Sequence, residues 1–297
     1  MDDVDFKILM ALFENSRETY RNLVKKMKEN EGLDLTENTV RKRIQSMIDS
    51  GIIEKFGINI NPAVFGFGVS IAIFEHGYNA FKRNFVEKLK KNERVMYAVD
   101  SIGTVSAIAF TFKDKDDMSR QIGAISSAMT PAKLVSTFIY ENLPAISVKL
   151  TPLDLAIIQS IKDDARKTPL DIAKEVGASA SSVKHRLESL VKNKIIDFTI
   201  IIQPFLIRDL IPYYLCITFN PNSNPADMEA AFSKVTKRFN KFWLRQRILE
   251  PPGFIMELYA STSQEVRENI EFLQEVKEVD KVIFFLPSRF YSFDRSG

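Results

Sequence analysis

Two short segments of the chain carry side chains that can hydrogen-bond to the edges of nucleic-acid bases. They lie at about residues 37–50 and about residues 180–193. In both, apolar residues recur every three or four positions, which predicts a helix with one buried face. On the opposite face, Arg and Lys suit guanine, Asn and Gln suit adenine, and Glu can accept from cytosine. The candidate DNA-contacting residues are Glu37, Asn38, Thr39, Arg41, Lys42, Arg43 and Gln45 in the first segment, and Ser181, Ser182, Lys184, His185 and Arg186 in the second.

The two candidate faces differ in chemistry. The second is smaller and less specific, so we hypothesise that the first segment reads more of the sequence and the second supplies more phosphate contact. Arg43 and Arg186 lie near the edges of their helices. Two roles are open for Arg43, because its side chain could reach a phosphate or brace the first helix near Asp5.

These segments are part of a repeat that spans the chain of 297 residues. The stretch VDFKILMALFENSRE from Val4 matches LDLAIIQSIKDDARK from Leu153 at an offset of 149. Further on, TVRKRIQSMIDSGII from Thr39 matches SVKHRLESLVKNKII from Ser182 at an offset of 143. The difference is an insertion of six residues in the first copy, within Lys28 to Asp34. We therefore interpret the chain as two copies of one plan.

Each copy opens with three helical patterns and a strand. In the first copy the helices are predicted at about 3–14 and 19–30, and the third ends at Ser50-Gly51 before a strand at 52–60. This order is typical of a winged helix-turn-helix, in which the third helix is presented to the major groove.

The remainder of each copy alternates between strand and helix patterns in the order β-α-β-β-α-β, the split βαβ or ferredoxin-like plan. In the first copy the elements are predicted at 69–74, 79–91, 94–100, 105–112, 115–128 and 133–140. In the second they are predicted at 212–219, 225–239, 241–249, 254–260, 263–275 and 280–286. The predicted fold is α+β, with two winged helix-turn-helix domains (1–61 and 149–204) alternating with two ferredoxin-like domains (62–148 and 205–297).

One strand pattern predicts how the sheets are covered. In Ile283-Phe284-Phe285-Leu286 both alternating faces are bulky and apolar. Since helices would cover only one face of such a sheet, the second face also needs burial, and another sheet face is the simplest cover. The two sheets can pack on each other as an internal pseudo-dimer, or a partner chain can do the same in a homodimer.

Composition excludes several other classes of protein. Hydrophobic residues make up 45% and charged residues 27%, which excludes wholesale disorder, and the net charge of +3 is too small for bulk electrostatic binding of nucleic acid. A basic patch must be local: residues 17–43 hold eight Lys or Arg against five Asp or Glu. Cys216 is the single cysteine, and His76 and His185 are the only histidines, so we expect no metal site and no cofactor. Acidic residues before Lys7 and the lack of a long apolar run lead us to expect a cytoplasmic protein without a membrane partner.

The chain resembles the Lrp/AsnC (feast/famine) transcriptional regulators, in a tandem duplicated form. The likeness is carried by Val4-Asp5-Phe6-Lys7-Ile8-Leu9, Asn15-Ser16-Arg17, Thr39-Val40-Arg41-Lys42-Arg43-Ile44 and Gly51-Ile52-Ile53, repeated at Leu153–Ile158, Asp164-Ala165-Arg166, Ser182–Leu187 and Ile195-Ile196. The resemblance implies a regulator that binds double-stranded DNA sequence-specifically, forms dimers through its sheet modules and senses an effector. It implies no enzymatic activity.

The same resemblance places an effector site at the turn between the middle strands of each sheet module. The corresponding residues are Gly103, Thr104, Ser106 and Gly253. The family often has Gly followed three residues later by Asp, whereas here Ser106 and Met256 stand at those positions. No carboxylate is available there to pair with a ligand's ammonium group, so the usual binding of a free amino acid is not expected.

Two alternative functions remain open. Siroheme decarboxylases are similar to this chain in architecture, and the likeness implies a histidine and an arginine around the second strand of the sheet module. The corresponding stretches, Arg94–Asp100 and Phe242–Arg247, contain no histidine. The other alternative is a protein-interaction module whose helix-turn-helix domains no longer bind DNA.

Overall fold

The computed structural model describes residues 1–77, 85–141 and 148–293, which form two compact units. The first unit takes its described residues from Met1–Val64 and Ala145–Arg208, and the second from Phe65–Pro144 and Asp209–Arg295. Each unit thus combines one part from each copy. Helices and strands occur in both units, and the predicted α+β fold class is confirmed. No described helix is both long enough and apolar enough to cross a membrane.

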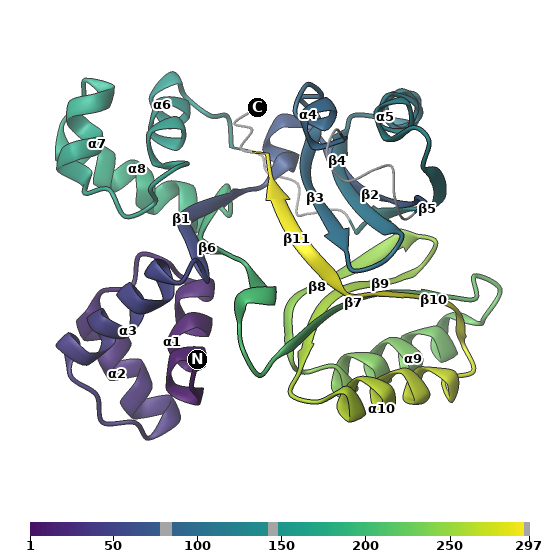
Figure 1. Ribbon diagram of the computed structural model, residues 1–297. Coiled ribbons are helices and arrows are strands. Elements are labelled where there is room, and N and C mark those ends of the chain that lie inside the picture. Colours follow the sequence, from purple (N-terminus) through teal and green to yellow (C-terminus); the bar gives the residue numbers. More distant parts are fainter. Residues whose placement is uncertain (78–84, 142–147, 294–297) are drawn as a thin grey trace. The chain divides into compact units, whose positions relative to one another are not determined.

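The first unit consists of two helix-turn-helix heads (Figure 1). The elements of the first head are α1 (Asp3–Glu14), α2 (Tyr20–Glu31), α3 (Glu37–Asp49) and β1 (Ile53–Ile60), followed by a 3₁₀ turn at Pro62–Phe65. Those of the second head are α6 (Pro152–Ile161), α7 (Pro169–Val176), α8 (Ala180–Lys192) and β6 (Ile196–Ile202), followed by a 3₁₀ turn at Pro204–Leu206.

Matching residues cap the helices of the two heads. Capping boxes start α1 at Asp2 and α6 at Thr151. Each of these side chains accepts the backbone N–H of the residue three positions on, Asp5 or Asp154, and the carboxylate of that residue accepts the backbone N–H of the cap residue. At the other end, Gly32 and Gly177 adopt left-handed conformations, with φ of 67° and 68°, and end α2 and α7.

The insertion in the first copy lengthens one helix. Helix α2 has 12 residues and α7 has 8, so four of the six extra residues add about one turn. The other two lie between Gly32 and the N-cap Thr36, where the second head has only Ala178 between its glycine and Ser179.

The two heads are joined by an antiparallel ribbon of β1 and β6, with Gly57 opposite Thr199 near its centre. Residues of β1 also enter the apolar core of the second head, where Ile58 and Ile60 pack against a cluster that includes Ile157. The strand that follows α3 in the chain therefore helps to form the core around α8, and the heads share structure.

The second unit contains both sheet modules. The first module has β2 (Gly68–Glu75), α4 (Phe85–Leu89), β3 (Val95–Ser101), β4 (Val105–Phe112), α5 (Lys115–Met129) and β5 (Lys133–Tyr140). The second has β7 (Ile211–Phe219), α9 (Pro225–Arg238), β8 (Phe242–Glu250), β9 (Gly253–Ala260), α10 (Ser263–Gln274), β10 (Val279–Phe285) and β11 (Pro287–Ser292). The first part of the helix predicted at 79–91 lies outside the described residues.

Hydrogen bonds order the nine strands as β10-β7-β9-β8-β5-β2-β4-β3-β11. Strand β8 of the second module joins β5 of the first, and β11 joins β3. Helices cover one face of each module, with Phe74 under α4 and α5 and Phe232 of α9 in the corresponding core. The other faces share one apolar cluster, to which the first sheet contributes Ile73 and the second Ile255. The sheets thus pack on each other within the chain, one of the two arrangements that the sequence left open.

Candidate nucleic-acid interface

Helix α3 presents the predicted polar face to the exterior of its head. Its inner stripe of Val40, Ile44 and Met47 is buried. The side chains on the opposite face are exposed, and they are Glu37, Asn38, Arg41, Lys42 and Gln45. The helix is started by Thr36, whose hydroxyl accepts the backbone N–H of Thr39 and lies 2.9 Å from the Thr39 hydroxyl.

Few contacts within the protein restrain this face. The guanidinium of Arg41 lies over the ring of Tyr20, 5.1 Å from its centroid, and the amide of Gln45 donates to Asp49 at 2.8 Å. Asn38 and Lys42 have no side-chain hydrogen bond or ion pair with any other described residue. A face of this kind retains donors and acceptors for a ligand.

Arg43 points instead toward the first helix of its own head. One terminal nitrogen donates to Asp5 at 2.7 Å and to Asp2 at 2.8 Å. The hydrogen bond to Asp5 and then that to Asp2 raise the pKa of Arg43, while the backbone N–H of Asp5 and then the Arg43 side chain lower the pKa of Asp2. The sequence left two roles open for Arg43, and its contacts with Asp2 and Asp5 are those of a brace on the first helix.

Helix α8 has the same design with a smaller polar face. Val183, Leu187 and Leu190 are buried. On the outer face, Ser181, Lys184 and His185 are exposed and Ser182 is half-buried. Arg186 lies 3.5 Å from the Asp154 carboxylate, which is the position equivalent to the Arg43–Asp5 contact.

The predicted effector residues have structural roles of their own. Gly103 and Thr104 lie in the turn between β3 and β4, where the Ser101 hydroxyl accepts the backbone N–H of Gly103 at 3.2 Å. Ser106 is fully buried. At Gly253 a side chain is excluded, because an added Cβ would lie 1.9 Å from the carbonyl oxygen of Ile217.

Ser106 belongs to a buried polar cluster that the sequence analysis missed. Its hydroxyl lies 3.0 Å from His76 Nε2 and donates to Asp100 Oδ1 at 3.4 Å. Asp100 and Ser106 are partners across the β3–β4 hairpin, whereas His76 follows β2, so no spacing in the sequence predicts that His76 meets them. Among the described residues, no group of three or more His, Cys, Asp or Glu side chains is placed to hold a metal ion.

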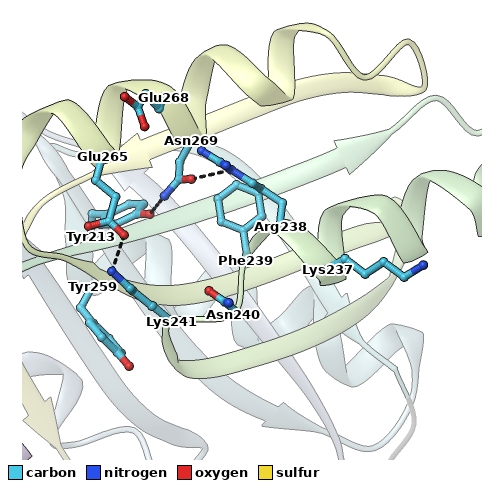
Figure 2. Close-up of a pocket in the computed structure, with 10 residues that line it drawn as sticks. All are labelled: Tyr213, Lys237, Arg238, Phe239, Asn240, Lys241, Tyr259, Glu265, Glu268 and Asn269. Carbon is cyan, nitrogen blue, oxygen red and sulfur yellow. Dashed lines mark hydrogen bonds and ion pairs between the residues drawn. The ribbon is translucent and has the colours of Figure 1, made fainter.

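A cavity of about 490 Å³ lies elsewhere in the second sheet module (Figure 2). Its polar wall contains a chain of hydrogen bonds in which Arg238 donates to Asn269 at 2.9 Å and Asn269 donates to Tyr213 at 2.8 Å. Lys241 pairs with Glu265 at 2.7 Å on another part of the wall. None of the four predicted effector residues lines this cavity.

Comparisons with known proteins agree with the helix-turn-helix geometry. Residues 150–197 match a family model described as winged helix-turn-helix DNA-binding. An uncharacterized HTH-type transcriptional regulator of Pyrococcus horikoshii is 27% identical over 128 residues, which cover 43% of this chain and 82% of that protein. The HTH-type transcriptional regulator Ptr1 of Methanocaldococcus jannaschii is 26% identical over 121 residues, or 40% of this chain and 78% of that protein. The chain is thus similar to HTH-type transcriptional regulators over rather less than half of its length.

The architecture also has a counterpart that spans nearly all of the chain. The crystal structure of the siroheme decarboxylase NirDL superposes with a TM-score of 0.57 and 11% identity, covering 98% of this chain and 92% of that one. At this identity the match supports the fold, with its helix-turn-helix and ferredoxin-like modules, and leaves the chemistry open.

Proposed function

We propose that the protein is a transcriptional regulator of Lrp/AsnC type that binds double-stranded DNA sequence-specifically through α3 and α8. The observation that carries the proposal is the exposed face of α3. It places Asn38, Arg41 and Lys42 on the third helix of a helix-turn-helix, with no ion pair to another described residue. The two sheet modules would form an internal pseudo-dimer and provide a site for a small effector.

The chemistry of this face fits the major groove of DNA. An α-helix enters that groove, and Arg, Lys, Asn and Gln can each read a base edge there. In the second head, Lys184 and His185 offer a smaller set of donors. We therefore assign most sequence discrimination to α3 and more of the phosphate contact to α8. Arg43 and Arg186 would hold α3 and α8 against α1 and α6.

The proposal is tested by selecting duplexes from a random library with the whole protein. An enriched motif is expected. The double variant Arg41→Ala/Lys42→Ala should bind the selected duplex at least about tenfold more weakly, since each good base contact contributes about 1–3 kcal/mol. Lys115→Ala/Arg120→Ala is a matched control, because it removes the same charge from exposed positions on α5.

Equal losses in the two double variants would indicate bulk electrostatics and contradict base reading by α3. If no motif is enriched and no duplex binds at low salt, the result would favour the alternative of a protein-interaction module whose helix-turn-helix domains no longer bind DNA.

A siroheme-decarboxylase-like activity is the second candidate, favoured by the fold match to NirDL over 98% of the chain. The described strands β3 and β8 contain no histidine, and His76 is buried beside Ser106 and Asp100. These residues offer no accessible imidazole on the two strands to serve as a proton donor near neutral pH. Titration with an iron-uroporphyrin III analogue distinguishes the candidates: a saturable shift of the porphyrin absorbance supports the enzyme, and an unchanged spectrum supports the regulator.

A further inference from the structure

The two heads exchange a matched pair of arginines. Arg17 of the first head donates to the carbonyl oxygens of Ala165 and Lys167 in the second, at 3.0 and 2.9 Å. In return, Arg166 of the second head donates to the carbonyl oxygen of Ser16 at 2.8 Å and to that of Glu18 at 3.5 Å. The repeat relates Arg17 to Arg166 and the accepting carbonyls to one another, so the exchange is a local two-fold arrangement within one chain.

Aromatic and backbone contacts surround each arginine in the same reciprocal way. The Arg17 guanidinium lies 5.0 Å from the centroid of the Phe198 ring, and that of Arg166 lies 4.1 Å from the centroid of Phe56. The backbone N–H of Ser16 donates to the carbonyl of Phe198, and that of Ala165 donates to the carbonyl of Phe56. We call the two arginines, with these rings and carbonyls, the arginine clasp.

The arginine clasp contacts the segments that adjoin the helix-turn-helix of each head. The accepting carbonyls lie immediately before α2 and α7, the helices that precede α3 and α8. The aromatic rings of the clasp, Phe56 and Phe198, lie in β1 and β6, the strands that follow α3 and α8. Each guanidinium therefore ties the start of one helix-turn-helix to the strand and loop of the other head.

The chemistry suits a positioning role. Burial lowers the pKa of both Arg17 and Arg166, yet both guanidinium groups donate to neutral backbone carbonyls. The planar guanidinium can donate to two carbonyls at fixed angles while stacking on a ring, whereas an ammonium group cannot do both. Such a contact fixes orientation as well as distance.

We propose that Arg17 and Arg166 are positioning residues that lock the two heads into one rigid body, so that a single chain reads a bipartite duplex site with one fixed spacing. The part about DNA rests on the proposed function. The part about rigidity stands on the clasp alone, and the two are measured separately.

Rigidity is measured without DNA. Spin labels on Ser46→Cys of α3 and Glu188→Cys of α8 occupy exposed positions, whereas native Cys216 is buried and burial raises its pKa to about 12, which keeps it unreactive. Pulsed electron spin resonance should give a narrow distance distribution in the labelled protein. Arg17→Ala/Arg166→Ala should at least double its width. The matched control, Arg120→Ala/Arg267→Ala, removes two exposed arginines of the other unit and should leave the width unchanged.

A second variant guards against loss of folding. Arg17→Lys/Arg166→Lys keeps both charges but cannot make the forked contact, and its helix content by circular dichroism should equal that of the parent. A distribution as narrow as the control's in this folded variant would overturn the clasp as a positioning device.

The DNA arm compares duplexes with the selected spacing and with five extra base pairs, about half a helical turn, between the half-sites. The parent protein should lose at least tenfold in affinity on insertion, and the lysine variant less than threefold. Equal losses in both would overturn the fixed-spacing inference. If the parent binds no duplex at all, the proposed function fails, while the spin-label result still decides whether the clasp holds the heads.

Discussion

Glu257 is an acidic side chain inside the packing between the two sheets, and its replacement tests that packing. It lies on β9, half-buried, opposite Tyr214 of β7, on the face that carries Ile255 into the shared cluster. Tyr97 and Tyr140 of the first module interact with it electrostatically and hydrogen-bond to each other at 2.8 Å. Burial raises the pKa of Glu257 from 4.5 to about 7, although its hydrogen bond with Tyr214 acts in the opposite direction.

The pH dependence follows from the difference between the folded and unfolded pKa. Below pH 4.5 the Glu257 carboxyl is protonated in both the folded and the unfolded state, so its burial as a charge does not reduce the free energy of unfolding. As pH rises from 4.5 to about 7, the unfolded chain ionises freely while the folded protein resists, so the free energy of unfolding falls. The loss levels off above pH 7 and amounts to at most about 3.5 kcal/mol, at about 1.4 kcal/mol for each pKa unit.

Glu257→Gln keeps the size of the side chain and removes the charge. We expect equal stability of variant and parent at pH 4.5, and a gain of about 1–3 kcal/mol for the variant at pH 8. Urea unfolding followed by the fluorescence of Trp243, the single tryptophan, reports on this unit. The exposed Glu250→Gln is the matched control and should show no change with pH. A Glu257→Gln effect that is constant from pH 4.5 to 8 would show that burial does not raise the pKa of Glu257.

Three further predictions concern packing, the α3 brace and electrostatics. Gly253→Ala should lower the melting temperature and the free energy of unfolding, the latter by at least about 2 kcal/mol, because the added methyl group meets the Ile217 carbonyl. Gly123→Ala, in open space on α5, should instead raise the free energy of unfolding by up to about 1 kcal/mol. A stabilising Gly253→Ala with a destabilising Gly123→Ala would contradict the packing at Gly253. Arg43→Ala should lower stability by about 1 kcal/mol while the selected DNA motif stays the same, since its partners are Asp2 and Asp5; a changed motif would make Arg43 a base reader. Affinity for the selected duplex should fall about 1,000-fold between 50 and 200 mM salt if about six phosphates are contacted, and a flat salt dependence would argue against a phosphate-contacting interface.

Local periodicity predicted most of the fold. The strands at 105–112 and 133–140 have the predicted bounds, because each segment is itself rich in β-branched and aromatic residues. Strand β11 was missed. It begins at Pro287, directly after β10, and exists only because it pairs with β3 of the other module, a contact between distant parts of the chain.

The candidate interface was predictable to the same depth. Periodicity correctly placed Arg41 and Lys42 on the exposed face of α3, whereas the direction of Arg43 depends on how α1 packs beside α3. The repeat matched Arg17 with Arg166, but only the paired heads reveal that each reaches into the other. The cavity beside Asn269 joins residues of α9, α10 and β7 that no local pattern connects.

Site-specific photo-cross-linking shows whether the exposed face of α3 lies against DNA bases. Gln45 is exposed on that face, and its replacement by p-benzoylphenylalanine leaves Arg41 and Lys42 in place. After irradiation with the selected duplex, we expect cross-links confined to the bases of one half-site. The same photo-cross-linker at exposed Lys115 of α5 should give none. Equal cross-linking from both positions, or none from position 45 on a duplex that is fully bound, would show that this face of α3 does not lie against the bases.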